Sequence, residues 1–185
     1  MKIAVVGGGI FGITVAVQLA QQGYDVELFE RNRDLLMAAS GVNQFRLHRG
    51  YHYPRSPETA QSCKRSEASF VHEYPEAIID DVKHYYGIAA QGSFVAWEEY
   101  LAFCDAQGLD YTVCWPAVVR RDTLSGCVRV TERLIDLEAL RRVCWARLRR
   151  LAITVHLQTD AHDSLLDAYD LIVACTYSTL NTLLS

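Results

Sequence analysis

The first thirty residues combine short apolar runs with one helical pattern. Residues 2–6 form an apolar run typical of a strand, and the three glycines at positions 7–9 end it. Residues 10–22 then carry apolar side chains at helical spacing, and Gly23 closes that segment. Residues 25–30, DVELFE, alternate between polar and apolar positions, which indicates a second strand. Strand, glycine turn, helix and strand together predict one βαβ unit and therefore a parallel sheet.

A further helix is predicted in the middle of the chain. Ser56, Pro57 and Glu58 form a helix start in which Ser56 is the N-cap and Pro57 lies in the first turn. The helix is expected to run toward Tyr74, and Pro75 should end or kink it because proline cannot extend a helix.

Two segments rich in β-forming residues follow this helix. They cover residues 82–95 and 111–130, are broken by glycines and by Pro116, and surround a short helix predicted over residues 97–107. We expect this block to be a second, more antiparallel region that is inserted between two nucleotide-binding segments. The aromatic side chains at Tyr85, Tyr86 and from Trp97 to Tyr100 are expected to lie in its core rather than to contact a cofactor.

The last fifty residues return to an alternation of helix and strand. Residues 136–150 predict a helix, residues 153–160 and 169–177 predict strands, and another helix is expected to begin at Ser178. The predicted fold class is therefore α/β, with a Rossmann-type cofactor domain built on a parallel sheet and an inserted, partly antiparallel segment.

Composition and charge are those of a soluble globular protein. Half of the 185 residues are hydrophobic, 22% are charged, and the formal net charge is −4. The mild acidity argues against a nucleic-acid partner, and we interpret the one basic run, residues 141–150, as a solvated helix face. The N-terminal apolar run is too short for a signal peptide or a membrane span. The six cysteines form no CxxC pair and no disulfide spacing, so we expect reduced thiols in a cytoplasmic protein.

A glycine motif at the N-terminus predicts a dinucleotide site. Gly7, Gly9 and Gly12 match GxGxxG, and the motif follows a strand and opens a helix, as such a site requires. The first glycine permits a tight turn, the second lets the backbone approach a pyrophosphate, and the third lets helix and strand pack closely. Glu30 ends the second strand, where an acid can bind ribose hydroxyls, although Arg31 beside it leaves a 2′-phosphate open. The motif alone does not separate NAD from FAD.

The stretch AASGVNQFRLHRGYHYPRS, residues 38–56, is polar and has neither a helical nor a strand period. A polar loop directly after the βαβ unit, followed by an inserted mixed region, resembles the D-amino-acid oxidase (DAO) superfamily of FAD-dependent oxidoreductases. In that superfamily the βαβ unit holds the ADP half of FAD, and the next segment runs along the cofactor to the flavin ring. The resemblance covers essentially the whole chain but only about half of a family member, so we expect an N-terminal fragment.

Within this superfamily the loop is most similar to the L-2-hydroxyglutarate dehydrogenase and oxidase arm. That arm's asparagine, histidine, glycine and final aromatic correspond to Asn43, His48, Gly50 and Tyr53. The chain departs from the arm where His52 replaces an aromatic, and where Gln44 and Arg46 replace small and apolar residues.

The resemblance implies a set of cofactor contacts that extends along the chain. Residues near Ala161 would contact adenine, and the loop from Ala174 to Thr176 would pass under the dinucleotide. The implied domains are residues 1–80 (FAD-binding unit and flavin-side loop), 81–131 (start of a substrate domain) and 132–185 (return to the FAD-binding domain). The predicted cofactor-binding residues are Gly7, Gly9, Ile10, Phe11, Gly12, Glu30, Arg31, Ser40, Asn43, Gln44, His48, Ala161, Ala174 and Thr176.

Candidate catalytic residues lie in the same loop. His48 and His52 could flank the flavin or accept a substrate proton, because imidazole titrates near neutral pH; each could instead hydrogen-bond the loop backbone. Arg46 and Arg55 could hold a substrate carboxylate, but a structural salt bridge or a phosphate contact is an alternative for both. No metal site is predicted, since the other four histidines have no ligand spacing: His72, His84, His156 and His162.

The expected activity is oxidation of a small hydroxy or amino acid by hydride transfer from its α-carbon to FAD. The expected partner is thus a small-molecule substrate, with no prediction for oligomeric state. Two alternatives remain: a truncated, non-catalytic cofactor-binding fragment, and an NAD-dependent dehydrogenase that uses the same βαβ unit.

Overall fold

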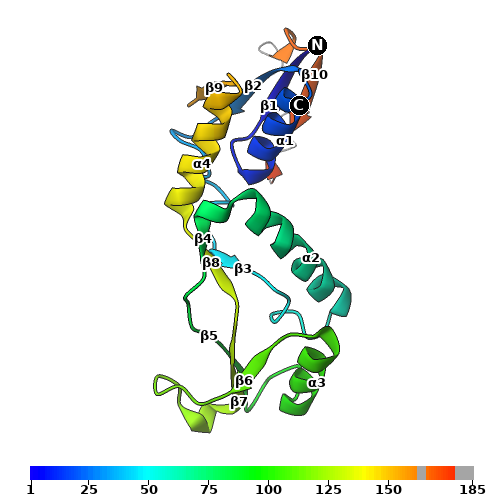
Figure 1. Cartoon of the computed structure of the whole chain (residues 1–185), viewed down its shortest axis with the longest axis vertical. Coiled ribbons are helices and arrows are strands. Elements are labelled where there is room, and N and C mark those ends of the chain that lie inside the picture. Colours follow the sequence, from blue (N-terminus) through cyan, green and yellow to red (C-terminus); the bar gives the residue numbers. More distant parts are fainter. Residues whose placement is uncertain (162–165, 178–185) are drawn as a thin grey trace. The chain divides into compact units, whose positions relative to one another are not determined.

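The computed structural model describes residues 1–161 and 166–177 and divides the chain into two compact units (Figure 1). The first unit comprises Met1–Gln44 and Leu137–Ser185, and the second comprises Phe45–Asp136. The polar loop of residues 38–56 therefore begins in the first unit and ends in the second. The sequence-based domains, with boundaries after residues 80 and 131, were defined by their expected roles in binding cofactor or substrate. That division stays a prediction.

The first unit is built on a four-stranded parallel sheet. Its strand order is β10-β1-β2-β9, and every neighbouring pair is parallel. Its elements are β1 (Lys2–Val6), α1 (Ile10–Gln21), β2 (Asp25–Glu30), α4 (Leu137–Arg150), β9 (Thr154–Leu157) and β10 (Leu171–Ala174). Parallel pairing of β1 with β2 across α1 confirms the predicted βαβ unit.

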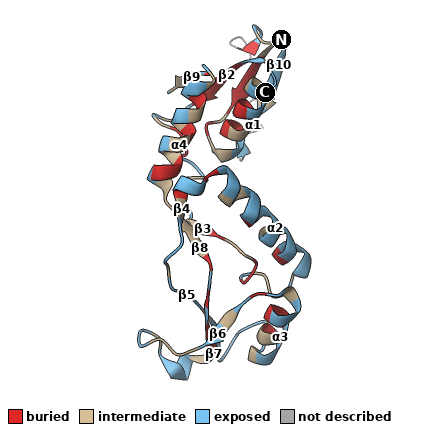
Figure 2. Cartoon of the chain, viewed as in Figure 1, coloured by how far each residue is buried: buried red, intermediate tan, exposed pale blue. Residues whose placement is uncertain are grey.

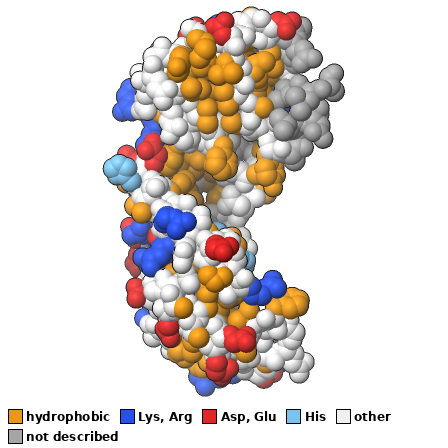
Figure 3. Space-filling view, turned by 90° about the vertical axis from the view of Figure 1, so that its right-hand side faces the viewer, with side chains coloured by type: hydrophobic (Ala, Val, Ile, Leu, Met, Phe, Trp, Pro, Cys, Tyr) orange, Lys and Arg blue, Asp and Glu red, His pale blue; other side chains and the backbone are white. Residues whose placement is uncertain are grey.

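The core of the first unit follows from the apolar runs in the sequence. Ile3, Ala4 and Val5 of β1 are fully inaccessible to solvent, because this strand is paired on both sides, and Figure 2 shows burial concentrated on β1 and β2. A strand buried on both faces needs a continuous apolar run rather than alternation. By contrast, Leu171 and Ile172 on the edge strand β10 are 44% and 45% exposed, and hydrophobic side chains gather on one face of the first unit in Figure 3.

A charged cluster links three neighbouring strands of this sheet, β1, β2 and β9. The carboxylate of Glu27 lies 2.8 Å from the ammonium of Lys2 and 2.5 Å from Nε2 of His156. His156 also stacks on Phe29, with ring centroids 4.5 Å apart. Burial would raise the pKa of Glu27, but the hydrogen bonds from Lys2, His156 and Tyr169 outweigh it and lower this pKa to about 2.

Glu27→Gln should make the first unit less stable at neutral pH and remove part of its acid sensitivity. The pKa of Glu27 lies below its ordinary 4.5, so its stabilisation is complete above that pH and is lost as pH falls toward 2. We expect a loss of about 1–2 kcal/mol at pH 7, as for one hydrogen-bonded charge, and only a small part of it at pH 2, where Glu27 is about half protonated in the folded state. Urea unfolding followed by the fluorescence of Trp145 measures this, with Asp25→Asn, an exposed acid of the same strand, as the control. An equal loss at both pH values would contradict the prediction.

The second unit contains two antiparallel sheets, each with three strands. One has the order β3-β8-β4 and the other β5-β7-β6. Its elements are β3 (Arg46–Leu47), α2 (Pro57–Glu73), η1 (Pro75–Ala77), β4 (Ile78–Ile79), β5 (His84–Ala89), α3 (Trp97–Gln107), β6 (Tyr111–Val113), η2 (Arg121–Thr123), β7 (Leu124–Val130) and β8 (Arg133–Ile135). The predicted inserted, partly antiparallel region is confirmed.

The core of the second unit is rich in aromatic side chains. Tyr51 and Tyr100 are essentially inaccessible and lie in one cluster with Phe103 and Val128. Tyr86 and Trp97 pack against this cluster, so the expectation of a core position is confirmed for Tyr86, Trp97 and Tyr100, whereas Tyr85 is 38% exposed. The cluster joins α3 and the β5-β7-β6 sheet to the loop that carries Tyr51.

Several details of the sequence-based elements need correction. The Ser56 side chain does not cap α2; its hydroxyl pairs with that of Thr59 at 2.7 Å. Strands β3, β4 and β8 have only two or three residues each, too few to give a periodic signal. The strands expected over residues 153–160 and 169–177 are confined to β9 and β10. The helix expected from Ser178 lies outside the described residues.

The cysteines and helices add two findings. All six cysteines are free thiols, and Cys104, Cys127 and Cys144 are buried as small apolar side chains. Within residues 1–161 and 166–177, every helix is too short or too polar to span a bilayer.

Candidate cofactor-binding site

The glycine loop of the first unit has no room for side chains at two of its motif positions. Gly7 has φ +113°, and a Cβ there would lie 2.5 Å from the carbonyl oxygen of Cys175. A Cβ on Gly12 would lie 1.9 Å from the carbonyl oxygen of Gly7. The first glycine therefore makes the turn and the third lets α1 pack against it, as the motif predicts.

The N-terminus of α1 is suited to an anion. The first N–H groups of a helix have no intrahelical acceptors, and they lie at the positive end of the helix dipole. The first turn carries no acidic side chain. The hydroxyl of Ser40, a predicted cofactor residue, accepts a hydrogen bond from the Ile10 N–H at 3.1 Å, so the residue 38–44 segment is tied to this helix start. Backbone N–H groups at such a terminus commonly bind phosphate.

Glu30 lies at the end of β2 and is only 7% exposed. Its Oε2 accepts a 2.6 Å hydrogen bond from the Gly8 N–H, and its Oε1 accepts from the backbone and side-chain nitrogens of Asn32 at 2.7 and 2.6 Å. An ionised carboxylate has about four acceptor positions, so these three bonds leave one for a ligand hydroxyl. The same carboxylate thus anchors the glycine loop and remains able to bind a ribose.

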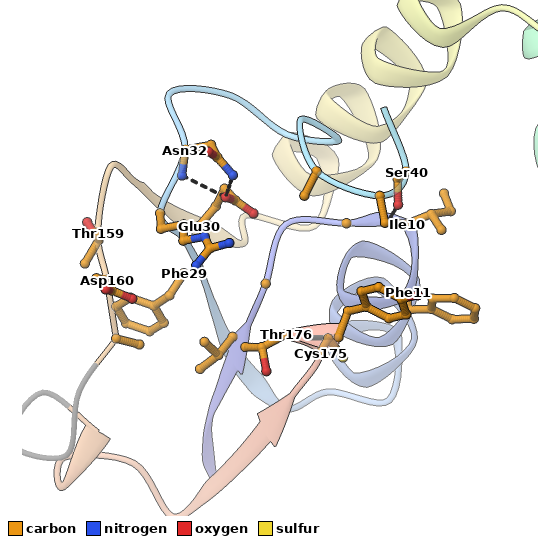
Figure 4. Close-up of a pocket in the computed structure, with 18 residues that line it drawn as sticks. Ile10, Phe11, Phe29, Glu30, Asn32, Ser40, Thr159, Asp160, Cys175 and Thr176 are labelled. Carbon is orange, nitrogen blue, oxygen red and sulfur yellow. Dashed lines mark hydrogen bonds between the residues drawn. The ribbon is translucent and has the colours of Figure 1, made fainter. Parts of the chain in front are cut away.

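These features surround one cavity of about 550 Å³, which lies entirely within the first unit (Figure 4). Figure 4 shows Glu30, Asn32, Thr159 and Asp160 on one side of the cavity and Ile10 and Ser40 at the start of α1. Nine predicted cofactor residues line it: Gly7, Gly9, Ile10, Phe11, Glu30, Arg31, Ser40, Ala161 and Thr176. The volume is in the usual range for a small-molecule or cofactor site.

Five predicted cofactor residues are not among those that line the cavity. Gly12 packs beneath the loop, Asn43 hydrogen-bonds the carbonyls of Ala39 and Ser40, and the others are Gln44, Ala174 and His48. His48 belongs to the second unit.

Nine further residues of the cavity wall were not among the predicted cofactor-binding residues. They come from strand ends and from the segments beside the predicted residues: Val6, Phe29, Asn32, Ala38, Ala39, Thr159, Asp160, Cys175 and Tyr177. The signal for Asn32 was its place two residues after Glu30, since a short amide there can bind the carboxylate of the strand end. Burial raises the pKa of the Cys175 thiol, so this wall residue is a neutral thiol at pH 7.

Glu30→Ala should weaken FAD binding by about 10- to 100-fold, the effect of losing a charged hydrogen bond of about 1.5–3 kcal/mol. The change removes both the anchor of the Gly8 N–H and the ribose acceptor. Quenching of FAD fluorescence on titration with protein gives the dissociation constant. Asp25→Ala, an exposed acid on the same strand, should leave it unchanged. Equal affinity for the Glu30 variant and the wild type would contradict the assignment.

A second polar cluster lies within the second unit, around Glu132. Its side chain is completely buried and pairs with the guanidinium Nη2 of Arg46. The Tyr86 hydroxyl donates to Oε2 of Glu132 at 2.9 Å, and the Arg49 N–H donates to Oε1 at 3.0 Å. Nδ1 of His48 lies 3.6 Å from Oε1. Within the described residues this is the most heavily paired carboxylate of the second unit.

The protonation of this cluster follows from its contacts. Burial would raise the pKa of Glu132, but His48, the Arg49 N–H, Tyr86 and the charge of Arg46 outweigh it and lower the pKa to about 2. Burial and the nearby Glu132 charge raise the pKa of Tyr86 far above its ordinary value. At neutral pH the carboxylate is therefore ionised and the phenol is protonated.

The candidate catalytic residues have distinct surroundings in the second unit. The Arg46 guanidinium is paired with Glu132, the structural alternative considered for it, and stacks over the Tyr86 ring at 4.7 Å. Arg55 lies 5.0 Å from the Phe94 ring. His52 is exposed and stacks on His48 with ring centroids 5.8 Å apart. The two imidazoles are thus neighbours, while Arg46 is engaged internally.

The comparisons with known proteins begin with a family model. The model described as FAD dependent oxidoreductase (DAO) matches residues 2–176. The matched range includes the glycine loop, the Glu132 cluster and every residue that lines the cavity except Tyr177. FAD, rather than NAD, is the cofactor of this family.

One curated relative and two solved structures extend this match. The FAD-dependent monooxygenase FPY4 of Fusarium mangiferae is 32% identical over 182 residues, which are 95% of this chain and 49% of that protein. Glycine oxidase from Geobacillus kaustophilus has a TM-score of 0.68 at 14% identity, over 88% of this chain and 48% of that one. L-alpha-glycerophosphate oxidase from Mycoplasma pneumoniae, solved with FAD bound, has a TM-score of 0.67 at 16% identity, over 86% and 45%. The fold is therefore that of FAD-dependent oxidases, and the chain spans about half the length of the proteins it matches.

Proposed function

Because the chain belongs to the DAO family of FAD-dependent oxidoreductases, we propose that it oxidises the CH–OH or CH–NH group of a small hydroxy or amino acid by hydride transfer to FAD. The observation that carries this proposal is the cavity at the glycine loop, which has Glu30 in its wall. Its donors and acceptors fit the ADP half of FAD. The activity proposed is that of the whole protein. The chain covers only 49% of the length of its Fusarium relative.

The cofactor-binding residues are assigned by the chemistry each offers. The N-terminus of α1, with Gly7 and Gly9 in the cavity wall, would hold the pyrophosphate. Glu30 would accept a hydrogen bond from a ribose hydroxyl, and the backbone near Ala161 would lie against adenine. Asn43 and Gln44, outside the cavity wall, stay candidates for the flavin side by resemblance of the loop.

The chemistry separates into a contribution of the cofactor and one of the chain. FAD, when bound, supplies the acceptor for two electrons and the hydrogen of the substrate α C–H bond. The proton of the substrate O–H or N–H must leave in the same oxidation, and we assign its acceptance to His48, with His52 as its neighbour. Imidazole suits this role because a catalytic base is most effective when its pKa lies near the operating pH. The resemblance of the loop supports this assignment.

We propose first that the substrate is a small molecule, and then more narrowly that it is a 2-hydroxy acid. Glycine oxidase and L-alpha-glycerophosphate oxidase, two structures with this fold, are named for small substrates, which supports a small molecule here. The loop residues Asn43, His48, Gly50 and Tyr53 favour a 2-hydroxy acid of the L-2-hydroxyglutarate kind. We therefore propose L-2-hydroxyglutarate as the first compound to test.

A second candidate function is monooxygenation. The observation that favours it is the name of the Fusarium relative, which is 32% identical over 95% of this chain. A monooxygenase uses O₂ and an external reductant and places one oxygen atom in its product, whereas an oxidase or dehydrogenase places none. Product analysis after reaction under ¹⁸O₂ with NADPH therefore separates the two.

The first experiment is an absorption spectrum of the purified chain after addition of FAD and removal of unbound cofactor. We expect a bound flavin band. L-2-hydroxyglutarate, glycine and glycerol 3-phosphate are then added without oxygen, and loss of the flavin band identifies a substrate. A folded chain that stays colourless would favour the non-catalytic fragment, and nicotinamide binding without flavin would favour an NAD-dependent dehydrogenase. A flavin band that no hydroxy or amino acid bleaches would overturn the proposed reaction.

A further inference from the structure

The Glu132 cluster contains two imidazoles that face one carboxylate. Nδ1 of His48 lies 3.6 Å from Oε1, and Nδ1 of His84 lies 3.7 Å from Oε2. Within the described chain, Nδ1 of His48 is buried and makes no hydrogen bond. Both rings thus present the same nitrogen to one fully buried anion.

Electrostatics decides which nitrogen of His48 carries the proton. A neutral imidazole has one N–H and one nitrogen lone pair. An unprotonated Nδ1 would direct its lone pair at the ionised Glu132 carboxylate, which repels it, and would leave a buried nitrogen unpaired. A protonated Nδ1 directs a positive N–H dipole at the same oxygen, and a shift of less than 1 Å brings it to hydrogen-bond distance. The Nδ1–H tautomer is therefore favoured.

The other partners of the Glu132 carboxylate fix its orientation. The Arg49 N–H and the Tyr86 hydroxyl each donate to one of its oxygens, and Arg46 balances its charge. These contacts fix the direction of Oε1 toward His48. A carboxylate that orients an imidazole in this way fixes the tautomer without taking the proton itself.

His48 rather than His84 is the imidazole that can exchange a proton outside the cluster. The side chain of His48 is 30% exposed, and that of His84 is 11% exposed. Burial and the nearby Arg46 charge also lower the pKa of His84, so this ring stays neutral. His48 in addition contacts His52 and Tyr53, whose ring centroids lie 5.8 and 6.0 Å away.

We propose that Glu132 is a positioning residue that holds His48 in the Nδ1–H tautomer, so that Nε2 of His48 is the unprotonated nitrogen available to accept a substrate proton. The use of Nε2 rests on the proposed function, while the tautomer does not. When Nε2 accepts the proton, the imidazolium that forms is stabilised by the nearby Glu132 carboxylate, which stays ionised.

The test is a long-range ¹H–¹⁵N correlation spectrum of the imidazoles in the whole chain, recorded with FAD added and at a pH where imidazole is neutral. The His48 signals are identified by their absence in His48→Gln. We expect the Nδ1–H tautomer in the wild type, and a fall of its population relative to the other tautomer by at least threefold in Glu132→Gln.

The matched control is Glu67→Gln, which removes another buried acid of the second unit that pairs with Arg49 and Arg133. It should leave the His48 tautomer unchanged. Predominance of the Nε2–H tautomer in the wild type overturns the inference, and this outcome does not depend on whether Glu132→Gln folds. Equal tautomer changes in both variants overturn the specific role of Glu132. The flavin band of the same samples reports on cofactor binding separately, so a failure of the proposed function is distinguishable.

Discussion

Gly12→Val is expected to abolish FAD binding by this chain. Even a single Cβ at this position would lie 1.9 Å from the carbonyl oxygen of Gly7, and valine adds two methyl groups beyond it. Because the obstacle is backbone rather than a flexible side chain, α1 and the glycine loop must separate. The N–H groups that the α1 terminus offers to the pyrophosphate then lose their placement. FAD titration followed by fluorescence should show a dissociation constant at least 100-fold larger than that of the wild type.

Gly23→Ala is the matched control for this variant. Gly23 follows α1, and nothing lies within 4 Å of its Cβ position. Its φ of +87° makes alanine strained by about 1–2 kcal/mol, so a modest loss of stability is expected with unchanged FAD affinity. Comparable loss of FAD binding in both variants would show that general destabilisation, rather than the loop geometry, is responsible. Wild-type affinity in Gly12→Val would disprove the assignment of the loop.

Glu132→Ala is expected to destabilise the second unit by about 3–5 kcal/mol, the usual effect of removing one partner from a buried ion pair. The Arg46 guanidinium would be left with uncompensated charge, and the Arg49 N–H and the Tyr86 hydroxyl would lose an acceptor. Urea unfolding followed by tryptophan fluorescence measures the change, since Trp97 and Trp115 belong to the second unit and Trp145 to the first.

The double variant Glu132→Ala, Arg46→Ala tests the physical cause. Removing both charges leaves no unpaired ion in the cluster, so the double variant should lose less stability than the sum of the two single variants. Strict additivity would mean that the two side chains do not interact. A loss below about 1 kcal/mol in the single Glu132 variant would mean that the site is well hydrated and not a buried pair.

The first unit was largely predictable because its signals are local. A continuous apolar run, a glycine turn and a helical pattern lie within thirty residues, and each is set by its own backbone and burial requirements. The helices α3 and α4 were predicted to within one residue of their observed ends for the same reason. The sheet order β10-β1-β2-β9 was not predicted, because pairing of β1 with β10 depends on contacts distant in sequence.

The site was predictable in part. The motif glycines, Glu30 and Ser40 follow rules of position, whereas Thr159 and Asp160 join the cavity wall only through the folding of strand ends onto the loop. Glu132 was missed because its role arises from β3, β5 and β8 being close in the second unit. A lone acid in a polar segment carries no sign that it will be buried against two imidazoles and an arginine.

The pairing of β1 with β10 also bears on the kinetics of folding. The backbone N–H of Lys2 donates to the carboxylate of Asp170 at 2.6 Å, across 168 positions of sequence. The wall of the cofactor cavity likewise joins Val6 and Gly7 to Cys175 and Thr176. Contacts of such long sequence separation must overcome a large loop-closure entropy and form slowly. We therefore expect the chain to acquire its capacity for FAD late in folding, after the β1–β2 pair has formed.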